Sequence, residues 1–359
     1  MLKLLIADDS ALMRKCLGDI FKTEGDFEIS FARNGAEALS MARSIAPDVI
    51  TLDVNMPEMD GITCLSRIMV ECPKPVVMVS SITGEGAEVT LQALSLGAVD
   101  FIPKPDGTVS LHIDKIKVAL VAKVRGAARA RISKTRGLLD RVRHRAQSLE
   151  DVKRSAGSAR TGVMTAAGTA NGVVLIGVST GGPGAIETVL PRLPRNFPWP
   201  ILIAQHMPES FTGVFARRIN SLSELEVVEV TRPMPLRGGV AYIGRGDADF
   251  LVGVRAGVLT AIPVPASPQH NWHPSVERLV ASALEHVTPE NLLGVMLTGM
   301  GDDGAAAMAE LRSRGGRTIA ESEDTAVVWG MPGELVKRGG ATLVLPIERV
   351  ADQLRRWAN

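Results

Sequence analysis

The sequence is poor in cysteine, in net charge and in long apolar runs. Its three cysteines, Cys16, Cys64 and Cys72, have no paired metal spacing, which suits reduced thiols in a reducing compartment. The 40 Lys and Arg residues nearly balance the 39 Asp and Glu residues, so we do not expect nucleic acid or another polyanion as the main partner. No apolar run approaches the roughly 18 residues that would span a bilayer. The first residues include two acids by position 9 and no small-residue cleavage site, so we expect a cytoplasmic protein.

Acidic residues follow two of the first apolar runs. Asp8 and Asp9 come after LKLLIA, Asp53 ends DVITL, and Lys104 follows FIP. Because open α/β sheets place their ligand sites at the carboxyl ends of strands, we expect these side chains to meet. Three crowded carboxylates need a cation, and oxygen ligands favour Mg²⁺, with Lys104 as a fixed counter-charge. Paired aspartates after a strand can instead cap a helix, but the joint spacing favours the acidic pocket.

Residues 1–122 resemble a response-regulator receiver domain. The segments MLKLLIADDSALMR, PDVITLDVNMPEMDG, PVVMVSS and GAVDFIPKP occur in the order and spacing of that family. The resemblance implies the following roles: Asp53 as phosphoacceptor, Asp8, Asp9, Asp53 and the backbone carbonyl of Asn55 as Mg²⁺ ligands, Ser80 as switch hydroxyl, and Phe101 and Lys104 as the other switch residues. An acyl phosphate adds nearly two negative charges, which Ser80 and Lys104 can approach only by moving their loops.

Composition divides the chain into two domains and a linker. A chain of 359 residues is too long for one ordinary core. Through about residue 106, short apolar runs alternate with helical patterns, as in a doubly wound parallel sheet. Residues 131–150 are Arg-rich and residues 155–171 are small and polar, so neither stretch can bury much of a core. The Arg-rich stretch lacks interleaved aromatic residues and is interpreted as a solvated helix face rather than a nucleic-acid patch.

The second domain begins with a strand, a tight turn and a helix. VVLIGV is followed by Ser179-Thr180-Gly181-Gly182-Pro183 and the helical pattern GAIETVLPRL. A serine at such a turn lies beside unpaired backbone N–H groups and the positive helix end, which favour developing negative charge. The same turn could bind phosphate, but it lacks the Walker ending and the dinucleotide fingerprint. A lone serine here is also often a helix cap.

Two more apolar strands end in polar residues. His206 follows PILIAQ, and Asp302 and Asp303 follow LLGVMLTG in the segment MGDDGAAAMAEL. Three strand ends of one parallel sheet would bring Ser179, His206 and one aspartate to a common crevice. His206 would accept the serine proton and return it to the leaving group, while the carboxylate fixes the imidazole tautomer. The N–H groups of Thr180 and Met300 are the candidate oxyanion donors.

Residues 173–350 resemble the catalytic domain of the chemotaxis protein-glutamate methylesterases, the CheB family. GVSTGGP, AQHMP, AYIGRGD, VMLTGMGDDGA and VVWGMP occur in that family's order, behind the receiver. The resemblance implies Ser179 as nucleophile, His206 as general base and acid, and Asp303, the acid directly before Gly304, as the orienting carboxylate. It also implies glutamate methyl esters on helical chemoreceptors as substrate, with methanol released, and deamidation of receptor glutamine as a further activity.

The residue patterns and the two resemblances together predict the fold class, the domain bounds and the partners of the chain. We expect two doubly wound parallel-sheet α/β domains: a flavodoxin-like receiver over 1–122 and a Rossmann-like esterase domain over 172–359, joined by a linker over 123–171. A chemotaxis-type histidine kinase would be the phosphodonor, and the chain would act as a monomer with Mg²⁺ in the receiver and no cofactor in the esterase domain. The unphosphorylated receiver would pack over the Ser179 crevice. A non-catalytic adaptor stays an alternative, whereas a helix-turn-helix regulator would need a basic output domain.

Some positions depart from the family pattern. His273-Pro274-Ser275-Val276-Glu277 stands where relatives commonly read Arg-Pro-Ser-Val-Asp, and Arg245 stands where proline is usual. Exchanging Arg for His forfeits a permanent charge and a forked donor, so the rim that faces the substrate would differ. His270 and His273 flank Trp272, but no carboxylate has metal-ligand spacing to them, and we expect this segment to be a solvent-exposed loop.

Overall fold

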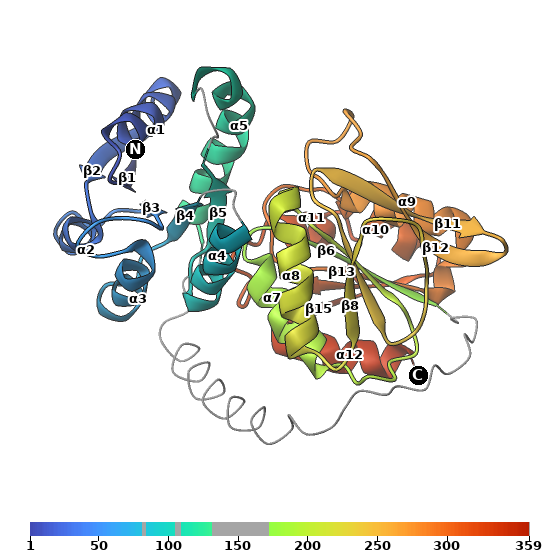
Figure 1. The fold of residues 1–359 in the computed structure, drawn as a ribbon. Helices are drawn as coiled ribbons and strands as arrows, with labels where there is room; N and C mark the ends of the chain where they lie inside the picture. Colours follow the sequence, from blue (N-terminus) through green and yellow to red (C-terminus); the bar gives the residue numbers. More distant parts are fainter. Residues whose placement is uncertain (81–83, 105–108, 131–171, 359) are drawn as a thin grey trace, which may run out of the picture.

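The computed structural model describes residues 1–80, 84–104, 109–130 and 172–358. These residues form two α/β units that lie side by side (Figure 1). The predicted linker core, 131–171, lies outside the described residues, and the domain boundaries at 122 and 171 stay predictions. No described helix has both the length and the apolar character needed to cross a bilayer.

The first unit is a five-stranded parallel sheet with the order β2-β1-β3-β4-β5. Its elements are β1 (Leu2–Ala7), α1 (Ala11–Glu24), β2 (Phe27–Ala32), α2 (Gly35–Ser44), β3 (Val49–Asp53), α3 (Gly61–Glu71), β4 (Val76–Ser80), α4 (Gly84–Leu96), β5 (Asp100–Pro103) and α5 (Val109–Ala128). Strands β3 and β4 are buried along their whole length, because helices cover both faces of the sheet. This explains why these strands read as continuous apolar runs.

The second unit contains a seven-stranded parallel sheet with the order β15-β14-β13-β6-β7-β10-β8. Its elements are β6 (Val173–Val178), α7 (Gly182–Val189), η1 (Leu190–Arg192), β7 (Ile201–Gln205), α8 (Glu209–Leu222), β8 (Glu226–Val230), β9 (Met234–Pro235), β10 (Val240–Gly244), β11 (Ala248–Arg255), β12 (Val258–Pro265), α9 (Val276–His286), η2 (Pro289–Asn291), β13 (Leu292–Met296), α10 (Ala305–Ser313), β14 (Arg317–Glu321), α11 (Met331–Lys337), β15 (Leu343–Leu345) and α12 (Ile347–Ala358). After β6, the chain adds β7 on one side of that strand, and β13 later pairs with β6 on the opposite side. Such a reversal leaves a crevice at the strand ends.

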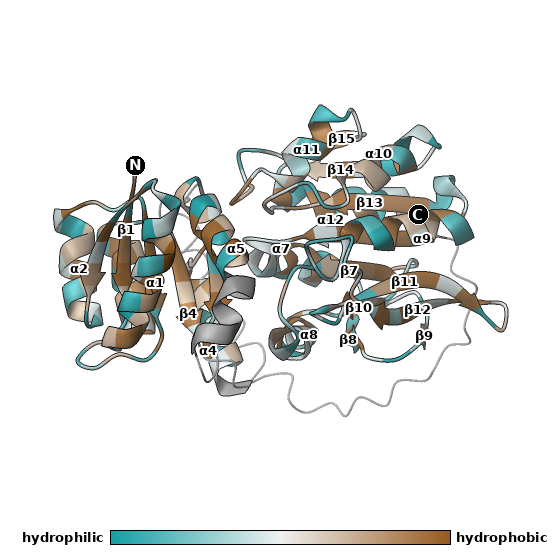
Figure 2. Ribbon diagram, turned by 90° about the horizontal axis from the view of Figure 1, so that it is seen from above, coloured by the Kyte–Doolittle hydropathy of each residue, from teal (hydrophilic) through white to brown (hydrophobic). Residues whose placement is uncertain are grey.

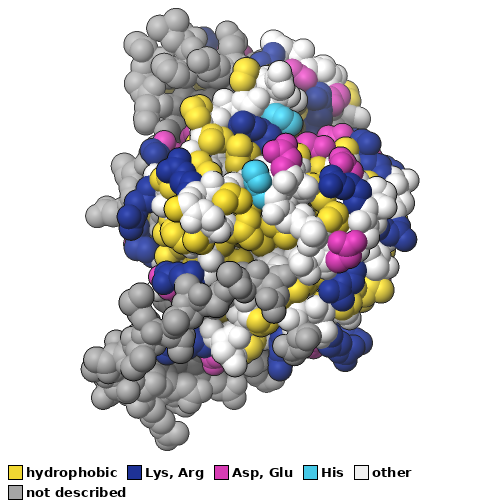
Figure 3. Space-filling view, turned by 90° about the vertical axis from the view of Figure 1, so that its right-hand side faces the viewer, with side chains coloured by type: hydrophobic (Ala, Val, Ile, Leu, Met, Phe, Trp, Pro, Cys, Tyr) yellow, Lys and Arg dark blue, Asp and Glu magenta, His cyan; other side chains and the backbone are white. Residues whose placement is uncertain are grey.

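The expected fold class is confirmed, with one addition. Both large sheets are parallel and carry helices on both faces, and their apolar strands lie between helices with hydrophilic outer sides (Figure 2). The sequence did not lead us to expect the small antiparallel sheet β11-β12-β9. Figure 3 shows the side of the molecule formed by the second unit, where hydrophobic side chains gather centrally and charged side chains of both signs surround them.

Helices α4 and α5 of the first unit face the second unit (Figures 1 and 2). Helix α4 packs against α7 and α8. A polar cluster links these three helices, since Arg218 on α8 binds Glu187 on α7 at 2.5 Å and donates to Ser95 on α4 at 2.7 Å. The two sheets are therefore joined through the helices that flank the carboxyl ends of β6 and β7.

Candidate active site

Strand register brings the three predicted polar residues to one edge of the second sheet. Val178 pairs with Gln205 in the β6–β7 ladder, so Ser179 and His206 follow on neighbouring strands. On the other side of β6, the Ser179 N–H donates to the carbonyl of Thr298 at 3.0 Å, and Thr298 leads into the loop that carries Asp303. This edge is the crevice where the strand order reverses.

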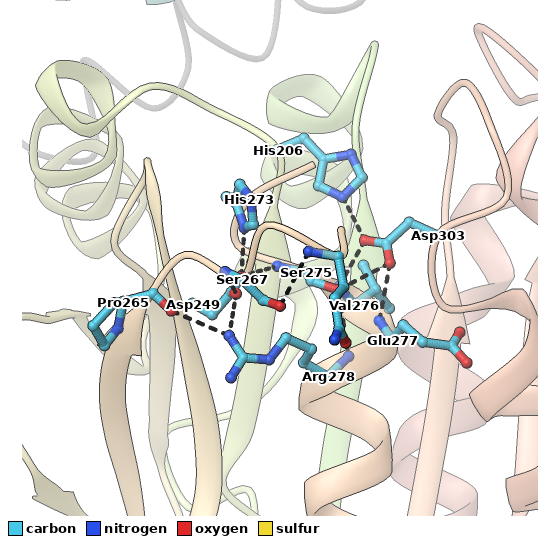
Figure 4. A network of polar contacts seen from close by, with 11 residues as sticks. His206, Asp249, Pro265, Ser267, His273, Ser275, Val276, Glu277, Arg278 and Asp303 are labelled. Carbon is cyan, nitrogen blue, oxygen red and sulfur yellow. Dashed lines mark hydrogen bonds and ion pairs between the residues drawn. The ribbon is translucent and has the colours of Figure 1, made fainter. Parts of the chain in front are cut away.

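His206 and Asp303 form a buried imidazole–carboxylate pair. His206 Nε2 lies 2.8 Å from Asp303 Oδ2, and Asp303 also accepts from the N–H groups of Val276 and Glu277 and from the Ser275 hydroxyl (Figure 4). Burial alone would raise the pKa of Asp303, but His206 and the N–H donors at the start of α9 bring it below its usual value. An ionised carboxylate can only accept hydrogen bonds, so Nε2 carries the imidazole proton.

The other imidazole nitrogen is the available base. His206 Nδ1 is buried and has no hydrogen-bond partner among the described residues. Ser179 is nearly buried at 9% exposure, and its side chain makes no hydrogen bond to His206 in the described part of the chain. Hydrogen bonds between nucleophile and base often tighten only when substrate binds. The arrangement therefore provides a proton acceptor at the strand end next to that of the serine.

Gln205 is a site residue that the sequence reasoning missed. Its side-chain amide donates to the carbonyl of Ser179 at 3.0 Å and to its neighbour's carbonyl, that of His206, at 3.1 Å. One buried amide thus ties the backbones of the predicted nucleophile and base together. The available signal was a polar residue ending the otherwise apolar strand ILIAQ.

The candidate oxyanion donors lie on two adjoining turns. No N–H of Thr180 or Met300 donates to a described residue. The turns are joined because the Thr298 hydroxyl donates to the Thr180 carbonyl at 2.9 Å. Gly299 is so close to the nucleophile that a Cβ added there would lie 2.8 Å from the Ser179 Cβ. Only glycine fits this approach.

A buried carboxylate accepts a hydrogen bond from the turn at Thr298. Glu321, at the end of β14, accepts from the Thr298 N–H at 2.8 Å and from the Thr325 hydroxyl at 3.0 Å. Its carbonyl accepts from the Trp329 indole N–H at 2.8 Å. Burial raises the pKa of Glu321 to about 7, so this carboxyl holds a proton more readily than an exposed glutamate.

The segment around Trp272 corrects an expectation. We expected residues 270–273 to form a solvent-exposed loop whose histidines have no carboxylate at metal-ligand spacing. The segment is a loop, but Trp272 and His273 are only partly exposed, and both contact buried polar residues. The Trp272 ring stacks on His206 with 5.8 Å between ring centroids and 16° between planes. His273 Nδ1 lies 2.8 Å from Oδ1 of the buried Asp249. Sequence spacing could not reveal this pair because β11 brings Asp249 to the loop from 24 residues away.

The acidic pocket of the first unit has the composition of a divalent-cation site. Carboxylate oxygens of Asp8, Asp9 and Asp53 all lie within 4.8 Å of one another. Lys104 Nζ lies 2.6 Å from Asp53 and 3.1 Å from Asp8. Burial raises the pKa of Asp53 although Lys104 opposes this. The Asn55 N–H donates to Asp53 at 3.3 Å, so this residue is next to the pocket.

Both predicted switch residues on β4 and β5 are buried. Ser80 ends β4, and its hydroxyl donates to the Gly86 carbonyl at 3.4 Å. Phe101 on β5 packs against Phe211 of the second unit, with ring centroids 4.3 Å apart. The switch aromatic position is therefore part of the contact between the two units.

The two units also meet beside the candidate oxyanion turns. Thr180 Oγ1 donates to Asp100 Oδ2 at 2.5 Å, and Gly126 of α5 approaches Met300 so closely that an added Cβ would lie 2.6 Å from its Sδ. A cleft of about 740 Å³ runs between α5 and this turn, lined by Arg125 and Arg129 on one side and by acids such as Asp302 on the other. The first unit thus covers part of the crevice edge.

Known proteins resemble both units. Residues 174–354 match the family model described as CheB methylesterase, and residues 4–114 match the response regulator receiver domain. A Rhodospirillum rubrum protein named protein-glutamate methylesterase/protein-glutamine glutaminase 3 is 59% identical over 359 residues, covering 100% of this chain and 97% of that protein. A Rhodopseudomonas palustris protein named protein-glutamate methylesterase/protein-glutamine glutaminase 2 is 57% identical, covering 100% and 99%. The crystal structure of the Thermotoga maritima CheB methylesterase catalytic domain is 36% identical, with a TM-score of 0.50, covering 52% of this chain and 97% of that chain.

Proposed function

Because this chain belongs to the CheB methylesterase family, with a receiver domain before the hydrolase unit, we propose that it is a phosphorylation-activated serine hydrolase that demethylates glutamate methyl esters on chemoreceptors. Glutamine deamidation at the same site is the accompanying activity. A chemotaxis-type histidine kinase donates the phosphoryl group. The observation that carries the proposal is the His206–Asp303 pair on the strand end next to Ser179. Its second imidazole nitrogen is buried and has no hydrogen-bond partner in the described part of the chain.

The proposed reaction has two halves. Ser179 Oγ attacks the ester carbonyl while His206 Nδ1 takes its proton, and Asp303 stabilises the resulting imidazolium. The N–H groups of Thr180 and Met300 bind the oxyanion, and losing one such donor typically costs about 2.7–4 kcal/mol of barrier. The imidazolium then protonates the departing methoxide oxygen, so that methanol leaves and the acyl-enzyme remains. Water attacks the acyl-enzyme with the same base, which releases glutamate and free Ser179. For a glutamine substrate, ammonia leaves in place of methanol.

Methanol release tests the hydrolase. Wild-type protein and Ser179→Ala are compared on receptor membranes carrying methyl-esterified glutamates. We expect Ser179→Ala to lose the release, whereas Ser221→Ala, a change at a surface hydroxyl of α8, leaves it unchanged. Release by Ser179→Ala at the wild-type rate contradicts the assignment of the nucleophile. If biological output persists without release, the adaptor alternative is favoured.

The acidic pocket supports regulation by phosphorylation. Its donor set of three carboxylates fits Mg²⁺, which Asp8, Asp9 and Asp53 would hold together with the Asn55 carbonyl, and which when bound neutralises phosphoryl oxygens. Asp53 is the proposed acceptor. Its new charge draws Lys104 and Ser80, and the displaced β5 loosens the contacts of Phe101 with the hydrolase unit. The receiver thereby uncovers the crevice.

Acetyl phosphate tests this regulation. With Mg²⁺ present, the full chain is expected to hydrolyse ester faster after the phosphodonor is added. Asp53→Asn should keep the basal rate and lose the increase, and residues 150–359 alone should be constitutively fast. Equal rates of the wild-type chain with and without the phosphodonor would contradict the proposal.

A further inference from the structure

A second imidazole–carboxylate pair lies next to the first. The Asp249 side chain is fully buried, and one of its oxygens accepts from His273 Nδ1 at 2.8 Å and from the Ser275 N–H at 2.7 Å. The other oxygen accepts from the Ser267 N–H at 3.1 Å and forms an ion pair with Arg278 (Figure 4). Burial by itself would raise the pKa of Asp249, but these donors bring it below its usual value.

Two of the residues bound by Asp249, His273 and Ser275, belong to a loop that touches both members of the predicted dyad. Trp272 stacks on the His206 ring. Three residues later, the Ser275 hydroxyl donates to Asp303 at 3.1 Å, and the Val276 N–H donates to Asp303 at 2.7 Å. Loop 272–276, which ends at the first residue of α9, therefore contacts the face of the imidazole and the oxygens of the carboxylate. Asp249 holds the same loop at His273 and at Ser275.

We infer that Asp249 is a positioning residue for hydrolysis, which it supports by holding loop 272–276 against the His206–Asp303 pair. This inference rests on the proposed triad. The physical reason is geometric: proton transfer from serine needs the imidazole within a few tenths of an ångström of its productive place, and that precision comes from supporting hydrogen bonds. His273 acts through its Nδ1–H as one of the two ties.

The number of donors bound by the Asp249 carboxylate favours a positioning role over a role in packing alone. Asp249 is the one anion that binds His273, Arg278 and two backbone N–H groups of the described chain. An amide at this position keeps the shape but can no longer accept from all four donors, so at least one tie to the loop is lost. The loop then shifts relative to Asp303 without an empty cavity in the core.

The test compares Asp249→Asn with Asp247→Asn. Asp247, two residues earlier, is exposed and accepts from the Glu209 N–H at 3.1 Å. An asparagine oxygen can also accept that bond, so this variant matches the chemical change without the loop contacts. Rates are divided by the number of serines labelled when a fluorophosphonate reaction has gone to completion, which counts folded active sites whatever the speed of labelling. We expect kcat per labelled site to fall roughly tenfold or more for Asp249→Asn with KM within about twofold, and Asp247→Asn to equal the wild type.

A second pair of variants separates positioning from substrate contact. In His273→Asn the side-chain amide can donate to Asp249 in place of Nδ1–H, whereas His273→Ala has no donor. We expect His273→Ala to lower kcat and His273→Asn to restore most of it. An unchanged kcat per labelled site in Asp249→Asn overturns the inference, as does equal loss in both His273 variants. Failure of the triad itself would be recognised separately, by activity in Ser179→Ala.

Discussion

Thr180 and Asp100 join the two domains through a buried hydrogen bond of 2.5 Å. Thr180 directly follows the predicted nucleophile, and Asp100 is the first residue of β5, one position before Phe101. Asp100 also accepts from Lys123 Nζ at 2.9 Å within the receiver. The first residue of β5 is therefore bonded directly to the turn that carries a candidate oxyanion donor.

Removing the Asp100 charge is expected to raise basal activity. In Asp100→Asn the amide accepts the Thr180 hydroxyl more weakly, because hydrogen bonds to a charged acceptor are about twice as strong as neutral ones. The unphosphorylated rate should rise severalfold, and the ratio of phosphorylated to unphosphorylated rates should fall. Steady-state ester hydrolysis with and without acetyl phosphate measures both. Asp19→Asn, an exposed change on α1, serves as the control. If both variants keep the wild-type basal rate, the hydrogen bond between Thr180 and Asp100 does not restrain the enzyme.

A methyl group at Gly299 is expected to disable the crevice. The added Cβ would collide with the Ser179 Cβ at 2.8 Å and with Met331 Sδ, so the turn bearing Met300 must move. We expect Gly299→Ala to lower kcat about tenfold to hundredfold and to destabilise the fold by about 1–3 kcal/mol. Gly184→Ala on α7, where a Cβ meets nothing within 4 Å, should be neutral or stabilising. Kinetics and thermal unfolding of both variants check this, and a fully active Gly299→Ala would refute it.

Loss of the Gln205 amide is expected to slow hydrolysis at nearly constant substrate affinity. Gln205→Met keeps the shape but removes the donors that join the carbonyls of Ser179 and His206. We expect kcat to fall about tenfold, since nucleophile and base lose their shared tie. The exposed Gln92→Met on α4 should behave as the wild type. A change confined to KM would mean that Gln205 faces the substrate instead.

Glu321 is expected to make stability depend on pH. Its folded pKa of about 7 exceeds the ordinary 4.5, so the native state binds the proton more tightly than the unfolded chain. The free energy of unfolding therefore falls as pH rises from about 4.5 through 7, by about 3 kcal/mol for a shift of this size. Glu321→Gln should unfold at a higher temperature than the wild type at pH 8 and at a similar temperature near pH 5.

Exposed Glu285 on α9 provides the matched control for this titration. Glu285→Gln should leave the difference between the two pH values unchanged. If the unfolding temperatures of wild type and Glu321→Gln differ equally at both pH values, the buried carboxyl is not the titrating group.

The sequence alone determined that the chain forms two parallel sheets and which polar residues follow the ends of their strands. Runs such as VVMV and VVLIGV contain no polar side chain because both faces of each sheet are covered. The acids, serine and histidine follow such runs at the strand ends. For this reason Ser179, His206, the Asp302-Asp303 pair and the acidic pocket could be named as candidates from local patterns, whereas the choice of Asp303 came from the family resemblance. The small sheet of β9, β11 and β12 gave no comparable signal, since half-exposed strands with proline resemble loops.

Only the tertiary structure decided which distant groups support those residues. Asp249 meets His273, Glu321 meets the Thr298 turn, and Asp100 meets Thr180 across 80 residues of sequence. Each contact depends on how separate elements pack, and spacing along the chain carries no information about such packing. Hydrogen bonds between buried side chains are fixed by three-dimensional register rather than by periodicity, so the residues that hold the site in place appear only when the elements have folded together.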